Sequence, residues 1–308
     1  MEKHLPVLLK ETIELLNIKA DGIYIDMTLG GGGHSEAILK RLISGKLFGF
    51  DQDVYAINKA KLRLKDYPNF EAINANFSNA KEELQMRNIQ SVDGIIFDLG
   101  VSSFQFDQAE RGFSYRFEAP LDMRMNQNQS LSAELIVNTY SQKELENIFF
   151  KYGEEKFSRN IAKNIIQHRS IFPIKTTFDL VDIIKKSLPA KELSKKGHPA
   201  KKIFQALRIE VNQELTILED SLKSAIDLLK PNGRLAVITF HSLEDRICKQ
   251  LFRELSTIYV PKNVPIIIDE EPLIRLINRK VITADEEELK ENNRSHSAKL
   301  RVIEKNSK

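Results

Sequence analysis

A run of four glycines and two aspartates are the residues whose types and spacing suggest chemistry. Gly30 to Gly33 follow an apolar segment and precede a helical pattern. Asp51 and Asp98 each end a later apolar segment. Glycine lets a ligand approach the backbone closely, and the first turn of a helix offers free N–H groups. We therefore expect a nucleotide-like ligand to lie across this turn.

The residues around the glycines do not match the motifs that bind phosphate groups. A GxGxxG dinucleotide fingerprint needs glycine where Ser35 stands, and the Walker lysine is absent because His34 and Ser35 follow the glycines. Asp51 is placed to accept both hydroxyls of an adenosine ribose, although a strand-end aspartate also serves simple turns. Phe77 follows a third apolar segment where an adenine would lie, although a lone phenylalanine is more often core. These positions suit S-adenosylmethionine, which has no diphosphate.

The elements that must position these residues alternate between strand and helix patterns. The pattern predicts one helix over 8–16 before the first strand, and three more helices between strands over 35–43, 54–64 and 80–86. Apolar segments bounded by turn residues predict buried strands over 22–28, 46–51, 70–75 and 92–100. This alternation indicates the α/β class with a parallel sheet, so that the strand-end residues Gly32, Asp51, Phe77 and Asp98 meet in one crevice.

The alternation stops after residue 100. Residues 131–188 show only helical patterns, including a capping box at Ser141 and Glu144. A continuous apolar stripe predicts one long helix over 207–229, and strands resume at 234–240, with two more expected in the segments VPIIID and AKLRVIEK. The charged segment 285–294 is interpreted as a solvated loop. We predict a discontinuous α/β domain of residues 1–106 and 213–308, interrupted by a helical insertion of residues 107–212 for substrate recognition.

Composition narrows the class of protein. The chain has 308 residues, 42% hydrophobic and 29% charged, which is typical of a globular protein in water. A net charge of +3 permits a nucleic-acid partner without requiring one. The single cysteine, Cys248, excludes an internal disulfide and indicates a reducing compartment. No secretion signal and no apolar run near about 18 residues is present, so we expect a cytoplasmic protein without a membrane partner.

Two other kinds of catalysis are disfavoured. Methylation at cytosine C5 usually needs a cysteine nucleophile, but Cys248 lies within a helical apolar pattern and is predicted to be buried. Hydrolysis by a serine and a histidine needs a GxSxG elbow, which the chain lacks. Ser242 is instead predicted to cap the helix after the strand at 234–240, and His241 to line a pocket.

The chain resembles the bacterial RsmH, or MraW, family of N4-cytosine methyltransferases that act on small-subunit ribosomal RNA. The resemblance extends from His4 to Val302 and is carried by HLPVLLKE, DMTLGGGGHS, FDLGVSSFQFDQAERGFSYRFEAPLDMRM, GHPAKKIFQALRIEVNQEL, GRLAVITFHSLEDRI and RSHSAKLRV. It implies a Rossmann-like methyltransferase sheet with an inserted all-helical domain and S-adenosylmethionine as cofactor. It places the donor contacts on Gly32, Gly33, His34, Asp51, Phe77, Asp98 and Gln105.

The resemblance also implies the acceptor, the exocyclic N4 amine of a cytidine in the decoding region of 16S rRNA, met within the 30S subunit. No metal is implied. The N4 lone pair is delocalised into the ring, so an acceptor that holds the N4 hydrogens turns the lone pair toward the methyl group. Asp98 is the candidate catalytic residue for this role; alternatively it holds the donor or caps its strand.

Candidate substrate contacts gather after Asp98 and in the lysine-rich segment 191–202. A flipped base usually stacks on an aromatic ring, and phosphates attract lysine and arginine. The candidate RNA contacts are Phe104, Arg111, Lys201, Lys202, Arg208 and His241. Each of them could instead pack in the core or lie on a solvated surface. Departures from the family pattern at Gln108, Lys202, Asn293 and His296 concern RNA contacts more than the donor site.

Two further functions remain open. The protein could methylate another RNA or a protein amine, because the donor site would be the same. It could also be a ribosome-assembly factor that binds S-adenosylmethionine without catalysis, although the glycines, Asp51 and Asp98 argue against this. A methyl-transfer assay separates these functions. From the sequence, Gly32→Val is expected to abolish donor binding in a protein that still folds.

Overall fold

The computed structural model describes the whole chain except residues 1–5, 102–104, 106–107, 259–270 and 308. Contacts within the chain divide it into two compact units. We call the first, Met1–Gly100 with Leu215–Lys308, the α/β unit, and the second, Val101–Glu214, the helical unit. The chain therefore leaves the α/β unit after β4 and returns to it at α12.

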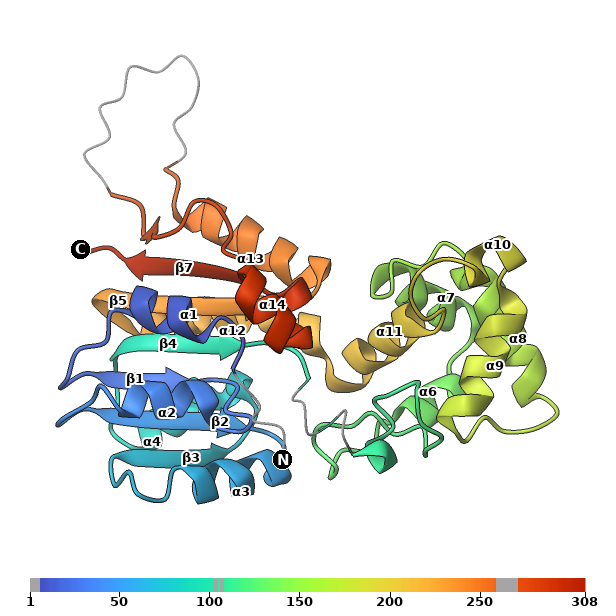
Figure 1. Ribbon diagram of the computed structural model, residues 1–308, viewed down its shortest axis with the longest axis horizontal. Coiled ribbons are helices and arrows are strands. Elements are labelled where there is room, and N and C mark those ends of the chain that lie inside the picture. The colour runs from blue at the N-terminus through green and yellow to red at the C-terminus, as the bar shows by residue number, and fades with distance from the viewer. Residues whose placement is uncertain (1–5, 102–104, 106–107, 259–270, 308) are drawn as a thin grey trace, which may run out of the picture. The chain divides into compact units, whose positions relative to one another are not determined.

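The α/β unit is built on a seven-stranded sheet of order β3-β2-β1-β4-β5-β7-β6. Strands β3, β2, β1, β4 and β5 run parallel, whereas β7 is antiparallel to both β5 and β6. In Figure 1 the arrowhead of β7 accordingly points away from that of β4. The strands are β1 (Ile23–Asp26), β2 (Lys46–Asp51), β3 (Phe70–Asn74), β4 (Val92–Asp98), β5 (Leu229–Thr239), β6 (Ile274–Leu276) and β7 (Lys299–Lys305).

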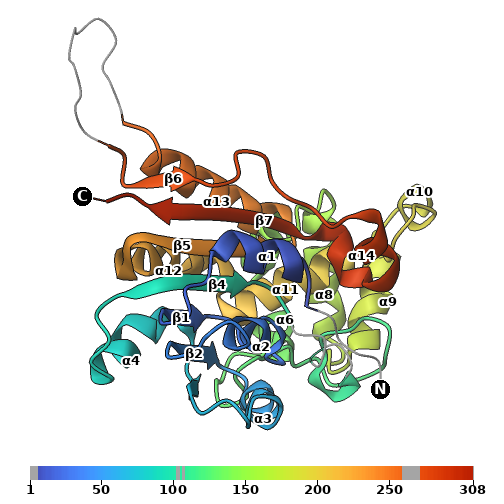
Figure 2. The same ribbon diagram turned by 60° about the vertical axis from the view of Figure 1, so that its left-hand side comes forward.

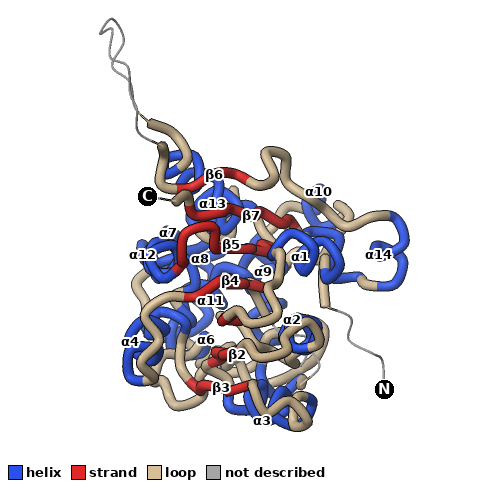
Figure 3. The backbone as a smooth tube through the Cα atoms, turned by 90° about the vertical axis from the view of Figure 1, so that its left-hand side faces the viewer, coloured by secondary structure: helices blue, strands red, loops and turns tan. Residues whose placement is uncertain are grey.

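Helices cover both faces of this sheet, which explains why its strands are almost continuously apolar. One face packs against α1 (Leu9–Leu16), α2 (Gly33–Leu39) and α3 (Val54–Arg63). The other packs against α4 (Ala80–Met86), α12 (Glu214–Leu228) and α13 (Ser242–Leu255). Figure 3 shows α1 and α2 on one side of the sheet and α4 and α12 on the other. The predicted Rossmann-like α/β fold is confirmed in this unit.

The helical unit has its own hydrophobic core, formed by side chains of the helices and of the loop 113–125. Its helices are α6 (Ala133–Thr139), α7 (Gln142–Lys151), α8 (Ser158–Arg169), α9 (Thr177–Ser187), α10 (Ala190–Leu193) and α11 (Lys201–Asn212), with the short η2 (Ala109–Arg111) before them. The predicted capping box at Ser141 and Glu144 starts α7, and a second one, at Thr176 and Asp179, starts α9.

Three predictions about elements are wrong. The helix expected over 207–229 is broken at Gln213, whose φ of 52° is left-handed, so that α11 ends and α12 begins there. The charged segment 285–294 is not a loop: Asp285 caps α14 (Glu286–Glu291), and η3 (Asn293–Ser297) follows. The cap of α13 is His241 rather than Ser242. The strand expected in AKLRVIEK is β7, whereas VPIIID lies outside the described residues.

Among the described residues, no helix has the length and apolar character needed to cross a membrane.

Candidate active site

Four neighbouring parallel strands bring their carboxyl ends to one edge of the α/β unit. Strand β1 pairs with β2 and with β4, and β2 pairs with β3. Figure 2 shows β4, β1 and β2 side by side with their arrowheads pointing the same way. The glycine turn follows β1, Asp51 ends β2, Phe77 follows β3 and Asp98 ends β4. Parallel sheets of this kind bind ligands at this edge.

Asp51 is held by backbone donors on both sides. Its Oδ2 accepts a hydrogen bond from the N–H of Gly30 at 2.9 Å, and its Oδ1 accepts one from the N–H of Asp53 at 2.9 Å. Burial raises the pKa of this carboxyl to about 6, although both backbone bonds act in the opposite direction. The Asp51 side chain thus ties β2 to the glycine turn and keeps a fixed orientation.

One carboxylate oxygen of Asp98 receives no hydrogen bond from the residues that the structure describes. Its backbone N–H donates to Oγ1 of Thr28 at 2.6 Å, which links the end of β4 to the turn after β1. Its Oδ1 is buried and has no hydrogen-bond partner among the described residues. A buried acceptor without a donor costs about 1–3 kcal/mol, so a ligand that supplies a donor would be favoured at this position.

His34 directly follows the glycine turn and lies beside Asp98. Its side chain is only 6% exposed, and its Nδ1 lies 3.7 Å from Oδ2 of Asp98. Its Nε2 lies 3.0 Å from the carbonyl oxygen of Val7. The carbonyl can only accept, so the Nε2 of His34 carries a proton and donates it. His34 therefore connects the segment before α1 to the end of β4.

A third strand-end carboxylate, that of Asp26, bonds to residues on either side of the glycine turn. Asp26, the last residue of β1, is 2% exposed, and its Oδ2 accepts a hydrogen bond from Oγ of Ser35 at 2.7 Å. Its Oδ1 accepts one from the N–H of Thr28 at 3.1 Å. Burial raises the pKa of the Asp26 carboxyl, and the bond from Ser35 acts against that rise. The sequence alone does not predict these contacts of Asp26, Thr28 and Ser35.

Two of the four glycines of the turn, Gly32 and Gly33, are required by the protein's own packing. A Cβ on Gly33 would lie 2.3 Å from Cγ of Pro6, so the segment before α1 rests directly on this residue. Gly32 has a left-handed φ of 74°, and a Cβ there would lie 3.1 Å from Leu64 and 3.4 Å from Ala60. The expectation that Gly32→Val leaves the protein folded is therefore revised, because valine would strain the backbone and crowd α3.

Phe77 is half-buried at the start of a short turn after β3, named η1 (Phe77–Asn79). Its ring packs edge-on against Phe97, with ring centroids 5.4 Å apart. The preceding Asn76 donates from its side chain to Gln52 at 3.0 Å, and its side-chain oxygen accepts from the N–H of Ser78. Phe77 therefore packs partly in the core, which was the alternative to an adenine contact. It also lies at the carboxyl edge of the sheet.

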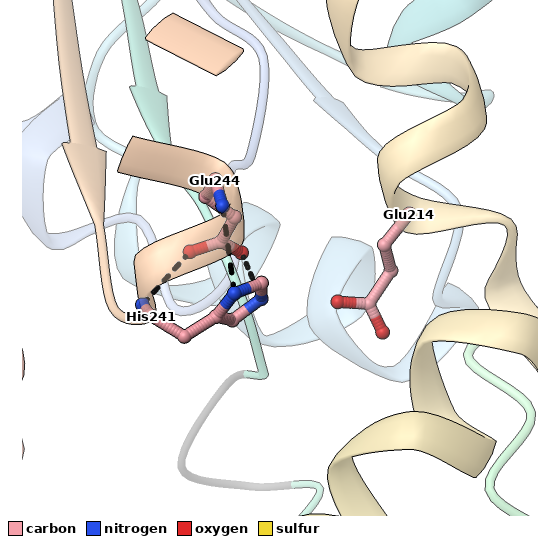
Figure 4. A group of neighbouring side chains, drawn as sticks. All are labelled: Glu214, His241 and Glu244. Carbon is pink, nitrogen blue, oxygen red and sulfur yellow. Dashed lines mark hydrogen bonds and ion pairs between the residues drawn. The ribbon is translucent and has the colours of Figure 1, made fainter. Parts of the chain in front are cut away.

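His241 starts α13 and pairs with Glu244 one turn later. Glu244 accepts from the backbone N–H of Phe240 at 2.8 Å and lies 3.1 Å from Nε2 of His241. Figure 4 shows these two side chains facing each other. Glu214, also labelled in Figure 4, belongs to the helical unit, where Arg208 holds it. His241 is thus a helix cap in the described structure.

Two candidate substrate residues, Arg111 and Arg208, form hydrogen bonds or ion pairs within the helical unit. Arg111 is 5% exposed and donates to the carbonyl oxygens of Arg124 and Met125. Arg208 forms two 2.8 Å bonds to the carboxylate of Glu214. These bonds give both arginines a structural role within the helical unit, as an alternative to the predicted contact with RNA.

The remaining candidates in the helical unit differ in exposure. Lys202 donates to the carbonyl oxygen of Glu154 at 3.0 Å and lies 3.8 Å from Glu155, whereas Lys201 is exposed. Gln105 is 5% exposed. Phe104 lies outside the described residues.

The arrangement at the carboxyl edge favours one kind of ligand. Asp26, Asp51 and Asp98 stand at the ends of adjoining strands, and their contacts with Ser35, Gly30 and His34 place their carboxylates around the glycine turn. Carboxylates accept hydrogen bonds and repel phosphate groups. The edge therefore suits a ligand with hydroxyl and ammonium groups and a positive charge.

Comparison with known proteins agrees with this chemistry. The model of the MraW methylase family matches residues 1–306. The chain is 54% identical to the ribosomal RNA small subunit methyltransferase H of Lactobacillus delbrueckii subsp. bulgaricus, over 98% of this chain and 99% of that protein. It is 56% identical to the protein of the same name from Streptococcus mutans serotype c, over 98% of this chain and 97% of that protein.

Among solved structures, an rRNA methylase from Streptococcus thermophilus aligns with a TM-score of 0.41 and 13% identity, over 97% of this chain and 94% of that chain. The assignment rests on the sequence relatives and on the family match, which both span nearly the whole chain. The chain belongs to the MraW methylase family.

Proposed function

We propose that the protein transfers a methyl group from S-adenosylmethionine to the exocyclic N4 of a cytidine in the decoding region of 16S rRNA. The observation that carries the proposal is the buried Oδ1 of Asp98, an acceptor without a partner in the described structure at the ligand-binding edge of the sheet. The relatives named ribosomal RNA small subunit methyltransferase H support the RNA substrate.

The residues at the edge fit this cofactor. Asp51, fixed by two backbone bonds, would accept the ribose hydroxyls, and Phe77 would contact the adenine. Asp98 would accept a hydrogen from the ammonium group of the amino-acid tail. Gly32, Gly33, His34 and Gln105 complete the proposed donor set. The carboxylates also favour the positive charge of a sulfonium, whereas they would repel a diphosphate.

When bound, S-adenosylmethionine supplies an electrophilic methyl group on a sulfonium. The chain's own residues must then orient the donor, exclude water and hold N4 in line with the methyl. The carbon–sulfur bond breaks as the nitrogen–carbon bond forms, and one proton leaves N4. The carboxylate of Asp98 is the proposed acceptor for a hydrogen of N4, in addition to its contact with the donor.

Substitution of Asp98 separates its two proposed roles. Asp98→Asn keeps the shape of the side chain but removes its charge. If Asp98 only holds the donor, the variant binds S-adenosylmethionine weakly and saturating donor restores the rate. If Asp98 also acts at N4, the rate at saturating donor stays low. Unchanged donor affinity together with an unchanged rate contradicts both roles.

The reaction itself is tested with labelled S-adenosylmethionine and two substrates that lack the modification, free 16S rRNA and 30S subunits. The RNA is digested to nucleosides after the reaction. Label in N4-methylcytidine is the expected result, with 30S subunits as the better substrate. Label in another nucleoside or in protein indicates a different acceptor, and donor binding without any transfer supports an assembly factor instead.

A further inference from the structure

The helical unit carries a stacked pair of rings that has no role in the donor site. Tyr115, from the loop after η2, and His198, from the loop before α11, lie with ring centroids 4.3 Å apart and planes inclined by 9°. Phe204 packs edge-on against Tyr115 at 5.6 Å and is itself buried in the core. Tyr115 is therefore anchored by the core, and the half-buried His198 ring lies flat on it.

The imidazole of His198 is held in its neutral form. Its Nδ1 accepts a hydrogen bond from the N–H of Ala200 at 3.2 Å, so the ring proton is on Nε2. Burial lowers the pKa of His198, and the positive charges of Lys185 and Arg116 lower it further. The result near neutral pH is an uncharged flat ring with two cations close to it.

The charges around this ring are strongly one-sided. Residues 185–202 contain seven lysines and a single acid, Glu192, which pairs with Lys195. Lys185 and Arg116 are exposed, and neither forms an ion pair with any residue that the structure describes. Unpaired cations beside a flat neutral ring combine attraction for phosphate with a face on which a base can stack.

We propose that the surface formed by Tyr115, Arg116, Lys185 and His198, called here the stacking surface, binds an unpaired stretch of the RNA substrate. A base stacks on the His198 ring, and phosphates lie against Arg116 and Lys185. Single-stranded RNA is favoured over an acidic peptide because a peptide carboxylate would use the cations but not the ring. The inference rests on the proposed function, since it names the surface that holds the RNA.

The test compares two oligonucleotides of the same length and charge, an oligouridine of about ten nucleotides and its abasic counterpart, on the full-length protein. The wild type should bind the oligouridine more tightly. His198→Ala should lose about tenfold in affinity for the oligouridine only, and His198→Phe should restore it. Arg116→Gln and Lys185→Gln should weaken both oligonucleotides and should each lower the slope of log K against log salt by about 0.7.

Lys223→Gln is the matched control, because it removes an exposed positive charge from α12 in the α/β unit. It should leave both affinities unchanged. Equal binding of the two oligonucleotides by the wild type overturns the proposal and indicates a surface for polyanions in general. Unchanged affinity in His198→Ala and Arg116→Gln also overturns it.

The labelled-nucleoside assay distinguishes failure of the stacking surface from failure of the proposed function. If the wild type forms N4-methylcytidine and the stacking-surface variants raise the KM for RNA but not the KM for the donor, both proposals are supported. If methylation occurs and the variants keep the wild-type KM for RNA, only the stacking surface is overturned. If the wild type forms no N4-methylcytidine while the variants still lose RNA affinity, the reaction is overturned and the surface stands.

Discussion

Nδ1 of His34 faces Oδ2 of Asp98 across 3.7 Å, while the other ring nitrogen of His34 donates to the carbonyl of Val7. The bond to Val7 fixes a proton on Nε2 and leaves Nδ1 as the ring nitrogen that faces the carboxylate.

Two substitutions at His34 separate its bond to Val7 from its contact with Asp98. Glutamine places an amide donor near the position of Nε2, so His34→Gln should keep the bond to Val7 and unfold near the wild-type temperature. Its methylation rate should fall about tenfold, because Asp98 loses its neighbour. His34→Asn places its amide near the position of Nδ1 and should lose about 1 kcal/mol of stability with the bond to Val7. Thermal unfolding and rates at saturating donor check this, and equal rates in the two variants would argue against a role for Nδ1.

Donor affinity should depend on pH through Asp51. The pKa of this carboxyl is raised to about 6 in the unbound protein, and ribose hydroxyls donate to its ionised form. Binding therefore strengthens as pH rises through 6, and affinity at pH 5 should be about tenfold weaker than at pH 7.5. Isothermal titration at the two pH values measures this change. Asp51→Ala should bind weakly at both, and a wild-type affinity that does not vary with pH contradicts the assigned role.

The Asp51 carboxyl should make the unbound protein less stable as pH rises, whereas it makes donor binding stronger. Because its pKa is raised on folding, the folded state binds more protons than the unfolded chain between about pH 4 and 6. Its contribution to the free energy of unfolding therefore falls as pH rises through this window and is level above it. Urea unfolding of the wild type and of Asp51→Ala at several pH values isolates the contribution of Asp51. If the two free energies of unfolding differ by the same amount at every pH, Asp51 makes no such contribution.

The segment before α1 should be sensitive to a methyl group on Gly33. In Gly33→Ala the new Cβ would meet Pro6 at 2.3 Å, which must displace the segment and with it the carbonyl of Val7. We expect a loss of about 1–3 kcal/mol and weaker donor binding. Gly30→Ala is the control, because its Cβ would meet no atom closer than 3.8 Å and only its left-handed φ of 49° is unfavourable. A Gly33→Ala protein as stable as wild type would show that Pro6 does not rest on this residue.

Ser35 should stabilise the protein through Asp26. Ser35→Ala removes the 2.7 Å bond to a buried carboxylate, which should cost about 1–3 kcal/mol at pH 7.5. The variant's Asp26 should have a still higher pKa, since the bond from Ser35 opposes the rise caused by burial. The loss should therefore be smaller at pH 5. Chemical unfolding at both pH values tests this, with the exposed Ser78→Ala as control and a loss independent of pH as the contrary result.

Much of the fold follows from local patterns. Short apolar segments between turn residues predicted β1 to β4, and the alternation with helices predicted that these strands run parallel, because a crossover helix returns the chain to the same end of the sheet. The strand-end positions of Asp51 and Asp98 followed from that order alone. The sequence also indicated the family, since its motifs extend along nearly the whole chain.

Other features depend on residues far apart in the chain. Glu288 of α14 accepts a hydrogen bond from the N–H of Leu8 at 2.8 Å, a contact across 280 positions, and this segment was expected to be a solvated loop. The apolar stripe through Leu207 and Leu218 continues past Gln213, but the backbone turns there, so periodicity alone could not show the break. Arg208 was predicted to contact substrate because a sequence does not show that Glu214 holds it.

The sequence by itself determined the parallel strands β1 to β4, the edge at which the acids meet and the family, because each depends on local periodicity or on motifs. It predicted neither β6 nor the antiparallel direction of β7. Only the tertiary structure decided how the edge is built. Pro6 rests on Gly33, the carbonyl of Val7 fixes a proton on Nε2 of His34, and Thr28 holds the end of β4. Oδ1 of Asp98 has no partner among the described residues. These contacts join segments that pack together only after the sheet has formed, and no local pattern encodes them.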